Sequence, residues 1–208
     1  MPNIIADIAG NFDALMRLLK KMPDDEVISL GDMVDRGPDS RAVIDWFMSN
    51  GRAVKGNHEH MLLDYCRKTG FYQEGMWMLN GGIATLASFR GVIPDDVLTW
   101  LERLPLYMEI DGCLISHSFV APGYSLREVC DIGPSSLDIK CERSIIWCRD
   151  APRRMRKYKM QIAGHNSQFS LRRFSDGRGD FAICLDDSRH RRLTGMHLPS
   201  LEIYQVDY

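Results

Sequence analysis

The sequence lacks the features that mark secreted and membrane proteins. Among its 208 residues no apolar run is long enough to span a bilayer, and no basic segment followed by an apolar one forms a signal peptide. Asn-x-Ser/Thr sequons are absent, and the six cysteines are scattered without a CxxC pair. We therefore expect a cytoplasmic protein with reduced thiols, rather than a disulfide framework or a thiolate-held zinc site.

A surplus of positive charge is also missing. The formal net charge is -2, whereas proteins that bind nucleic acids or anionic membranes usually carry a basic surplus. We therefore expect neither a nucleic-acid partner nor a membrane partner. The 45% of hydrophobic and 26% of charged residues are ordinary for a globular protein, and we find no repeat or linker. A single domain over residues 1–208 is the simplest organisation.

Short apolar runs alternate with helical patterns in the first third of the chain. Residues 4–6, 27–30 and 53–54 predict strands, and apolar residues at helical spacing separate them. Such an order implies parallel strands joined by right-handed crossovers. The stretch 58–104 is mostly helical in pattern, with breaks at its glycines. Asp111-Gly112 and Asp176-Gly177 are hairpin signals. Further strands are predicted at residues 106–110, 113–116, 160–163, 171–174, 181–185, 193–198 and 201–206. The pattern favours an α/β fold with a second sheet packed on the first.

Five of the predicted strands lead into a side chain that can bind a metal. In an open α/β sheet such side chains gather at the carboxyl ends of the strands, so all five could converge on one site. The mixed oxygen and nitrogen donors suit Mn²⁺, Fe or Zn²⁺ better than Ca²⁺, and one Asp carboxylate could bridge two ions. Each residue alone is a common turn or cap residue, but five in glycine-marked turns favour a metal site. The residues are Asp7, Asp32, Asn57, His117 and His165.

Two of these turns carry further reactive side chains. GDMVDRG (residues 31–37) places Asp35 and Arg36 beside a ligand, and GNHE (residues 56–59) does the same for His58. An imidazole that is next to a ligand but not bound can protonate a leaving alkoxide, and Asp35 could orient it and raise its pKa. Arg36 offers a planar fork for phosphate oxygens. A surface ion pair for Arg36 and a purely structural His58 remain the alternatives.

The ordered set of motifs resembles the phosphoprotein phosphatase family of metallophosphoesterases, especially its compact bacterial and phage serine/threonine phosphatases. The resemblance covers Asp7, GDMVDRG, GNHE, the histidine of LISH and the histidine of IAGHN. Asn80-Gly81-Gly82 and Trp147-Cys148-Arg149 resemble two further blocks of the family. The resemblance implies the calcineurin-like fold, in which two mixed β-sheets are sandwiched between helical layers.

The resemblance also implies an activity and a role for each residue. The chain would hydrolyse phosphomonoesters, on phosphorylated serine or threonine of a protein or on a small phosphoester, by in-line attack of a metal-bridging hydroxide. Two divalent ions, Mn²⁺ first and Fe or Zn²⁺ as alternatives, would be the cofactors. Asp7 and a bridging Asp32 would hold the first ion, and Asn57, His117 and His165 would complete the second. The remaining roles are phosphate binding by Arg36, Arg149 and Asn57, and proton transfer by His58 with Asp35.

Position 9 departs from the family pattern. The family has Asp-x-His-Gly where this chain has Asp7-Ile8-Ala9-Gly10, so the resemblance implies a weakened first metal site and reduced activity. Because every other block is kept, an engineered change is favoured over natural divergence. Two rival functions stay open: hydrolysis of dinucleoside polyphosphates or cyclic nucleotides at the same site, and non-catalytic phosphate binding. GNHE in place of GNHD argues modestly against the dinucleoside tetraphosphatases.

Overall fold

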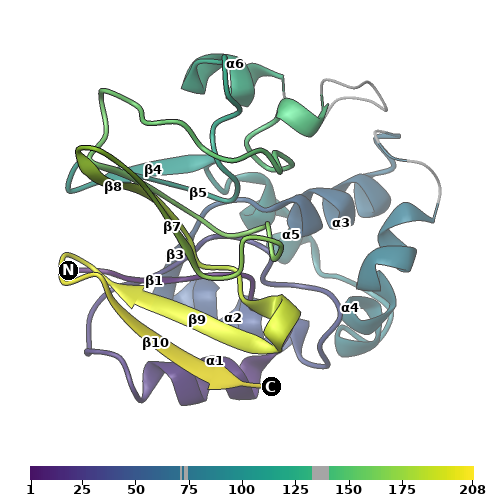
Figure 1. Cartoon of the computed structure of the whole chain (residues 1–208). Coiled ribbons are helices and arrows are strands. Elements are labelled where there is room, and N and C mark those ends of the chain that lie inside the picture. The colour runs from purple at the N-terminus through teal and green to yellow at the C-terminus, as the bar shows by residue number, and fades with distance from the viewer. Residues whose placement is uncertain (71, 73–74, 133–140) are drawn as a thin grey trace.

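The first of two β-sheets contains the parallel strands expected near the start of the chain (Figure 1). The structure is a computed structural model that describes residues 1–70, 72, 75–132 and 141–208. Strand β1 pairs parallel with β2, and β2 with β3, whereas β9 runs antiparallel to both β1 and β10. The sheet has the order β10-β9-β1-β2-β3. The bounds are β1 (Asn3–Ile5), β2 (Val27–Ser29), β3 (Gly51–Ala53), β9 (Arg192–His197) and β10 (Glu202–Asp207).

The second sheet comes from the C-terminal half and is also mixed. Its order is β4-β5-β6-β8-β7, with parallel pairs in the centre and antiparallel strands at both edges. The two predicted hairpins form, one around Asp111-Gly112 and one after Asp176. The prediction of two mixed sheets is therefore confirmed. The bounds are β4 (Tyr107–Ile110), β5 (Cys113–Ser116), β6 (Met160–Ala163), β7 (Arg172–Asp176) and β8 (Gly179–Cys184).

The core between the sheets explains why the central strands are almost wholly apolar. Ile4 and Ile28 pack in one cluster with Ile115 and Ile162 from the opposite sheet. Ile5, which points to the other face of its strand, belongs instead to the cluster beneath the helices. Strands buried on both faces need apolar residues at successive positions rather than in alternation. This packing fixes the strand ends of one sheet opposite those of the other.

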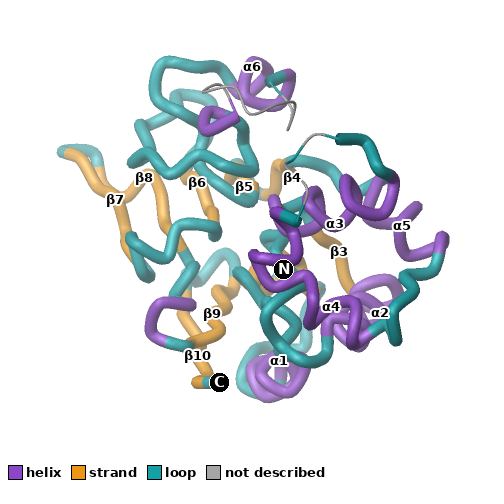
Figure 2. Tube along the Cα trace, turned by 90° about the vertical axis from the view of Figure 1, so that its right-hand side faces the viewer, coloured by secondary structure: helices purple, strands orange, loops and turns teal. Residues whose placement is uncertain are grey.

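Helices cover the outer face of the first sheet and surround the edge that carries the motifs. Figure 2 shows α2, α3, α4 and α5 on one side of the molecule and the second sheet on the other. Helix α6 (Leu126–Asp131) packs through Val129 on the outer face of the second sheet. No helix in the described ranges has both the length and the apolar character needed to cross a lipid bilayer. The remaining bounds are α1 (Phe12–Leu19), α2 (Ser40–Asn50), α3 (Asn57–Arg67), α4 (Ile83–Ser88) and α5 (Asp95–Glu102).

The segment around Asn80-Gly81-Gly82 contains the break that its glycines predict. A helical turn, η1 (Met78–Gly82), is interrupted by a kink at Gly81, whose backbone is not helical, before α4 begins. Gly81 has φ of +110°, a conformation that residues with a side chain rarely adopt. A Cβ at Gly82 would lie 2.5 Å from the Trp77 ring. The glycine pair therefore permits both the kink and the close packing against Trp77.

Candidate active site

The five predicted metal ligands lie together where the two sheets meet. Asp7, Asp32 and Asn57 follow β1, β2 and β3 of the first sheet, and Asn57 is the first residue of α3. His117 directly follows β5 and His165 follows β6 of the second sheet. The carboxyl ends of these parallel strands share an edge, as the sequence predicted.

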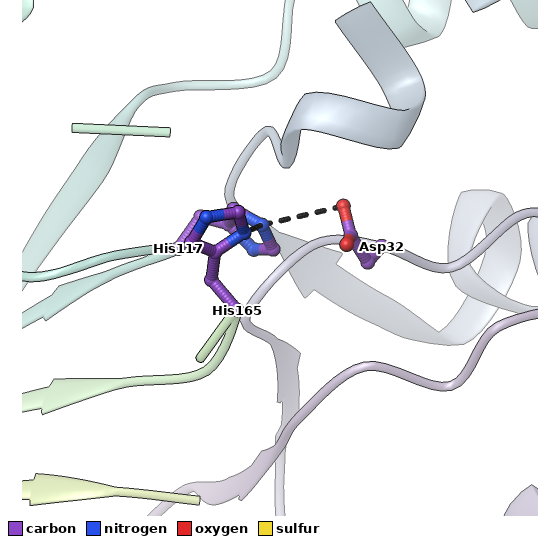
Figure 3. A group of neighbouring side chains, drawn as sticks. All are labelled: Asp32, His117 and His165. Carbon is purple, nitrogen blue, oxygen red and sulfur yellow. Dashed lines mark hydrogen bonds and ion pairs between the residues drawn. The ribbon is translucent and has the colours of Figure 1, made fainter. Parts of the chain in front are cut away.

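Among the described residues, Asp32, His117 and His165 form a compact group suited to a metal (Figure 3). Their ligand atoms all lie within 4.8 Å of one another. The Nε2 atom of His117 is 3.3 Å from Asp32 Oδ1, 2.9 Å from Asn57 Oδ1 and 3.2 Å from His165 Nδ1. The four side chains thus converge on a point from two sheets.

The hydrogen bond of His117 to the backbone directs a ring lone pair to this point. Its Nδ1–H donates to the carbonyl of Leu30 (2.7 Å), so the neutral ring leaves a lone pair on Nε2. Burial lowers the pKa of His117 and of His165, which favours the neutral form that binds metals. Lone pairs of Nε2 and of the Asn57 and Asp32 oxygens therefore face one another. His165 Nε2 is also buried without a hydrogen-bond partner among the described residues. This donor set fits a divalent cation.

Asp7 adds a second buried carboxylate beside the same group. The backbone N–H of His165 donates to both of its oxygens (3.1 and 3.2 Å). Burial, together with the charges of Asp186 and Asp32, raises the pKa of Asp7. Burial would also raise the pKa of Asp32, but the charges of the nearby His117 and His58 outweigh burial and lower the pKa of Asp32 to about 2. Because both carboxylates are buried away from water, a bound cation would stabilise their negative charges.

The backbone of several predicted site residues has an unfavourable conformation. Asp7, Asp32, Asp35, Arg36 and His165 all have positive φ, from +36° to +72°. Residues other than glycine rarely adopt this region, and each such residue stores of order 1–3 kcal/mol. The surrounding fold must therefore hold these turns in place.

Close approach of the two motif loops requires glycine at a specific point. Gly31 has φ of +89°, and a Cβ on it would lie 2.5 Å from the backbone nitrogen of Gly56. The Asp32 carboxylate similarly occupies the space that a side chain at Gly56 would need. The glycines of GDMVDRG and GNHE thus let the backbones of the two loops touch.

The backbone of Ala9 is fixed by hydrogen bonds to the GDMVDRG loop. Its N–H donates to the carbonyl of Asp32 (2.8 Å), and its own carbonyl accepts from Gly37 N–H (2.9 Å). The residue is buried and has φ of +49°. Position 9 is therefore held between the two ends of the GDMVDRG loop, where its methyl group offers no lone pair to a metal.

Asp35 and His58 form the predicted pair. His58 Nδ1 lies 2.6 Å from Asp35 Oδ2. Burial would lower the pKa of His58, but the charge of Asp32 and the hydrogen bond with Asp35 outweigh it and raise that pKa. Asp35 is fully buried and also accepts from Trp77 Nε1 (3.0 Å) and Thr85 Oγ1 (2.6 Å). Sequence reasoning missed Trp77 and Thr85, although both flank the Asn80-Gly81-Gly82 block that it noted.

Both predicted phosphate-binding arginines border the group. The Arg36 guanidinium is 3.0 Å from His58 Nε2, and its backbone N–H donates to the carbonyl of Gly81 (3.3 Å). The charge of Arg149 contributes to lowering the pKa of His165, after burial and His117. Asn166 holds the Arg149 segment through a 2.8 Å hydrogen bond to its carbonyl. Both side chains are exposed, so a phosphate could reach them.

Glu59 is a structural residue whose role sequence reasoning missed. Its carboxylate is fully buried and accepts three backbone N–H groups, from Asp32 (2.8 Å), Met33 (2.7 Å) and Gly56 (2.8 Å). Burial and the charge of Asp32 raise its pKa to about 7. The last letter of GNHE could have signalled this, because an acid at the third position of a helix often binds the backbone at the helix start.

Replacing Glu59 with Gln should lower the free energy of unfolding by about 1–3 kcal/mol. The amide has only one acceptor oxygen, so its NH₂ group would face at least one of the three buried N–H donors. Urea denaturation of the metal-free protein, at a pH about one unit above the Glu59 pKa, measures the change.

The matched control is Glu26→Gln, which changes a partly exposed glutamate paired with Arg52. Surface pairs contribute little, so its urea midpoint should stay close to that of the parent chain. Equal small losses in both variants would mean that Glu59 does not hold the two loops together.

Comparison with known proteins places this site in a family. Residues 3–207 match the family described as Calcineurin-like phosphoesterase. The chain has the metallophosphoesterase fold and belongs to the calcineurin-like phosphoesterase family. Its resemblance to phosphoprotein phosphatases, predicted from the ordered motifs, is confirmed.

Two relatives show how far the likeness extends. The chain is 32% identical over 114 residues to serine/threonine-protein phosphatase 1 of Salmonella typhimurium, covering 51% of each protein. It is 30% identical over 131 residues to a symmetrical bis(5'-nucleosyl)-tetraphosphatase of Vibrio parahaemolyticus, covering 60% of this chain and 46% of the relative. The chain thus spans about half the length of the curated relatives it matches.

Solved structures agree on the fold. A crystal structure of a putative diadenosine tetraphosphatase superposes with a TM-score of 0.68 at 21% identity, over 100% of this chain and 93% of that one. A yeast serine/threonine phosphatase similar to human PP5 gives 0.61 at 15% identity, over 100% and 79%. At these identities the likeness concerns the fold alone.

Proposed function

We propose that this protein is a metal-dependent phosphomonoesterase that acts on phosphoserine and phosphothreonine of a protein or peptide. The observation that carries the proposal is the buried pair of Asp35 and His58. Arg36 contacts Nε2 of His58. The group of Asp32, His117 and His165, which is suited to a metal, lies beside this pair. An alkoxide is a poor leaving group and needs a proton from such a pair. The relative named as a serine/threonine-protein phosphatase gives further support.

Five residues would hold two divalent ions. Asp7 and Asp32 would bind the first, and Asp32, Asn57, His117 and His165 the second. Mn²⁺ is the first choice for these oxygen and nitrogen donors, with Fe or Zn²⁺ as alternatives. When bound, such ions lower the pKa of coordinated water towards neutrality and stabilise charge on the phosphoryl group.

The chain's own residues would do the remaining work. Arg36 and Arg149, with the Asn57 amide, would bind phosphate oxygens and align phosphorus. Asp35 accepts the Nδ1–H of His58 and so fixes the ring. In this structure Nε2 accepts from the Arg36 guanidinium, so Nε2 would take up its proton when Arg36 turns to a phosphate oxygen. The Nε2 proton would pass to the leaving oxygen as a water oxygen bonds to phosphorus in line and the phosphorus–oxygen bond to the side chain breaks. The products would be inorganic phosphate and a serine or threonine hydroxyl.

Hydrolysis of dinucleoside polyphosphates is the second candidate, because several relatives are named as symmetrical bis(5'-nucleosyl)-tetraphosphatases. A non-catalytic phosphate-binding role with reduced metal content is the third, motivated by Ala9. A cytoplasmic location and a single domain over residues 1–208 belong to the same proposal. The five described cysteines are all free, which supports that location.

A substrate panel separates these functions. Phosphoserine and phosphothreonine peptides, diadenosine tetraphosphate and a cyclic nucleotide should be assayed with Mn²⁺, using the chain itself and Ala9→His. The phosphopeptides should give the highest kcat/KM. A preference for the dinucleotide would establish the second candidate, and no turnover by either protein would favour phosphate binding alone.

Replacing Arg36 or Arg149 with Ala should lower kcat/KM for a phosphopeptide by about 10²–10³-fold, the usual loss for one donor to a developing anion. Each guanidinium is proposed to bind an equatorial phosphate oxygen. Steady-state kinetics with Mn²⁺ measures the effect.

The controls are Arg153→Ala and Arg156→Ala, which remove exposed arginines from the basic stretch just beyond Arg149. Both should keep nearly all activity. Similar small losses in all four variants would reduce Arg36 and Arg149 to members of a general charge cluster.

A further inference from the structure

We propose that Tyr72, a residue outside every motif of the sequence, is a positioning residue for the second metal ion. Tyr72 connects helix α3, which begins with the proposed ligand Asn57, to the ring of Trp147. That ring packs against the proposed ligand His165. This role rests on the proposed metal-dependent function, because it concerns how firmly the ligands of one ion are held relative to each other.

The hydroxyl group of Tyr72 joins two residues that are far apart in the sequence. It accepts a hydrogen bond from the indole N–H of Trp147 at 3.0 Å, and it lies 3.0 Å from Nδ1 of His60. An indole N–H can only donate, so the hydroxyl keeps its own proton for a lone pair on His60 Nδ1. All three side chains are half-buried, so water competes only partly for these hydrogen bonds.

The backbone of Tyr72 is attached to α3 as well. Its N–H donates to Asp64 Oδ2 (3.2 Å), and the hydroxyl of Thr69 donates to the same carboxylate. Asn57, His60 and Asp64 are spaced three and four residues apart, so they lie along one face of the helix. Tyr72 is therefore anchored twice on the helix face that begins with a proposed ligand.

Four rings continue this connection from α3 to the candidate metal site. The ring centroids are 5.5 Å apart for His60 and Tyr72, 5.9 Å for Tyr72 and Trp147, and 6.0 Å for Trp147 and His165. The planes of the three pairs meet at 80°, 64° and 89°, which is the edge-to-face arrangement that aromatic rings favour. Trp147 therefore restricts rotation of the His165 ring, whose Nδ1 is 3.2 Å from His117 Nε2.

The position of Trp147 explains why such a connection affects the ion. Trp147 packs against two core clusters, the one beneath the helices of the first sheet and the one on the outer face of the second sheet. The second ion would likewise draw Asn57 from α3 and two histidines from the other sheet. Groups that orient metal ligands from outside contribute to metal affinity. Tyr72 would thus fix the distance between the two halves of the site.

Calorimetric titration of the chelator-treated protein with Mn²⁺ tests this role without measuring activity. Because Ala9 weakens the first site, the tighter ion of the parent chain should be the second. Tyr72→Phe removes only the hydroxyl and should raise the Kd of that ion about 10-fold, the lower end of the loss for groups that support a ligand. Trp147→Phe keeps a ring without the N–H and should raise it at least as much. The double variant should bind no more weakly than Trp147→Phe, because both changes remove the same hydrogen bond.

The matched control is Tyr65→Phe, which removes a hydroxyl from a 46% exposed tyrosine of the same helix. Its Kd for the tighter ion should equal that of the parent chain. An equal loss of affinity in Tyr65→Phe and Tyr72→Phe would overturn the role of Tyr72, because the effect would then not depend on the contact with Trp147.

Urea denaturation of each metal-free variant separates positioning from a merely structural role. A structural Tyr72 would lower the urea midpoint and leave the Kd of the folded protein unchanged, which would overturn the inference and leave the proposed function standing. If no chain binds Mn²⁺, Ala9→His included, the proposed function is overturned and the inference with it. If Tyr72→Phe does not fold, Trp147→Phe is judged by the same criterion, and unfolding of both would overturn the positioning role.

Discussion

Replacing His58 with Asn should slow hydrolysis of a phosphoserine peptide by about 10²–10⁴-fold, the usual contribution of general acid catalysis. Hydrolysis of p-nitrophenyl phosphate should fall far less, because nitrophenolate leaves without a proton. The difference follows from the 2.6 Å contact with Asp35, which fixes the ring with Nε2 towards the substrate. Comparing kcat for the two substrates with Mn²⁺, in the chain itself and in Ala9→His, measures it.

Two companion measurements show whether His58 acts as the acid. Asp35→Asn should reproduce the effect more weakly, because the imidazole remains but is less basic and less well oriented. Manganese content should not change in His58→Asn, since the backbone N–H of His58, not its ring, donates to Asp32 Oδ1 (3.1 Å). If both substrates slow equally and manganese is lost too, His58 supports the metal site and another residue supplies the proton.

Replacing Asp32 with Asn should abolish most metal binding and lower kcat/KM more than about 10²-fold. Asp32 is the proposed shared ligand, so its loss weakens both sites, each by at least the ~10–100-fold typical of outer-shell changes. The isosteric amide still offers Oδ1 to the His58 N–H. Thermal unfolding with and without Mn²⁺ gives a readout independent of turnover. A metal at 100 times its Kd stabilises the native state by about 2.7 kcal/mol. This stabilisation by Mn²⁺ should disappear in Asp32→Asn.

The control for Asp32 is Asp45→Asn, an exposed carboxylate of α2 that pairs only with Arg41 in the described contacts. The stabilisation of Asp45→Asn by Mn²⁺ should match that of the parent chain. An Asp32→Asn protein that keeps the full stabilisation would show that the metal is held elsewhere, and the assignment of Asp32 as shared ligand would be wrong.

The strands could be predicted from the sequence where burial alone decides them. The predicted strands at residues 113–116 and 160–163 coincide with β5 and β6, because each is a short apolar run between turn residues and is buried on both faces. The predicted strand at 171–174 was displaced, since β7 is an exposed edge strand at Arg172–Asp176 with one buried residue, Phe174. Its register depends on pairing with β8, which no local pattern contains.

At Asn80-Gly81-Gly82 local propensity predicts a break, and the structure has a kink at Gly81. The direction of the chain after the kink could not be predicted. It depends on the contact of Trp77 with Asp35 and on the hydrogen bond from the Arg36 N–H to the Gly81 carbonyl. These contacts join residues more than forty positions apart, so no local pattern contains them.

The residues of the site likewise differ in whether a local sequence pattern predicts them. Its proposed ligands follow strand ends, so their positions could be inferred from periodicity and converge as predicted. Glu59, Trp77 and Thr85 act through buried contacts that depend on which loops meet in space.

The division of the site between two sheets has a consequence for how the protein opens. Asp7, Asp32 and Asn57 follow strands of one sheet, and His117 and His165 follow strands of the other. The His165 N–H donates to Asp7, so residue 7 is held against residue 165 across the sandwich. A fluctuation that slides one sheet past the other separates these residues while leaving the hydrogen bonds within each sheet intact. An ion bound by both sheets opposes that motion specifically, acting as a reversible cross-link. Loss of the ion would therefore expose the apolar seam between the sheets to proteases and aggregation before either sheet had unravelled.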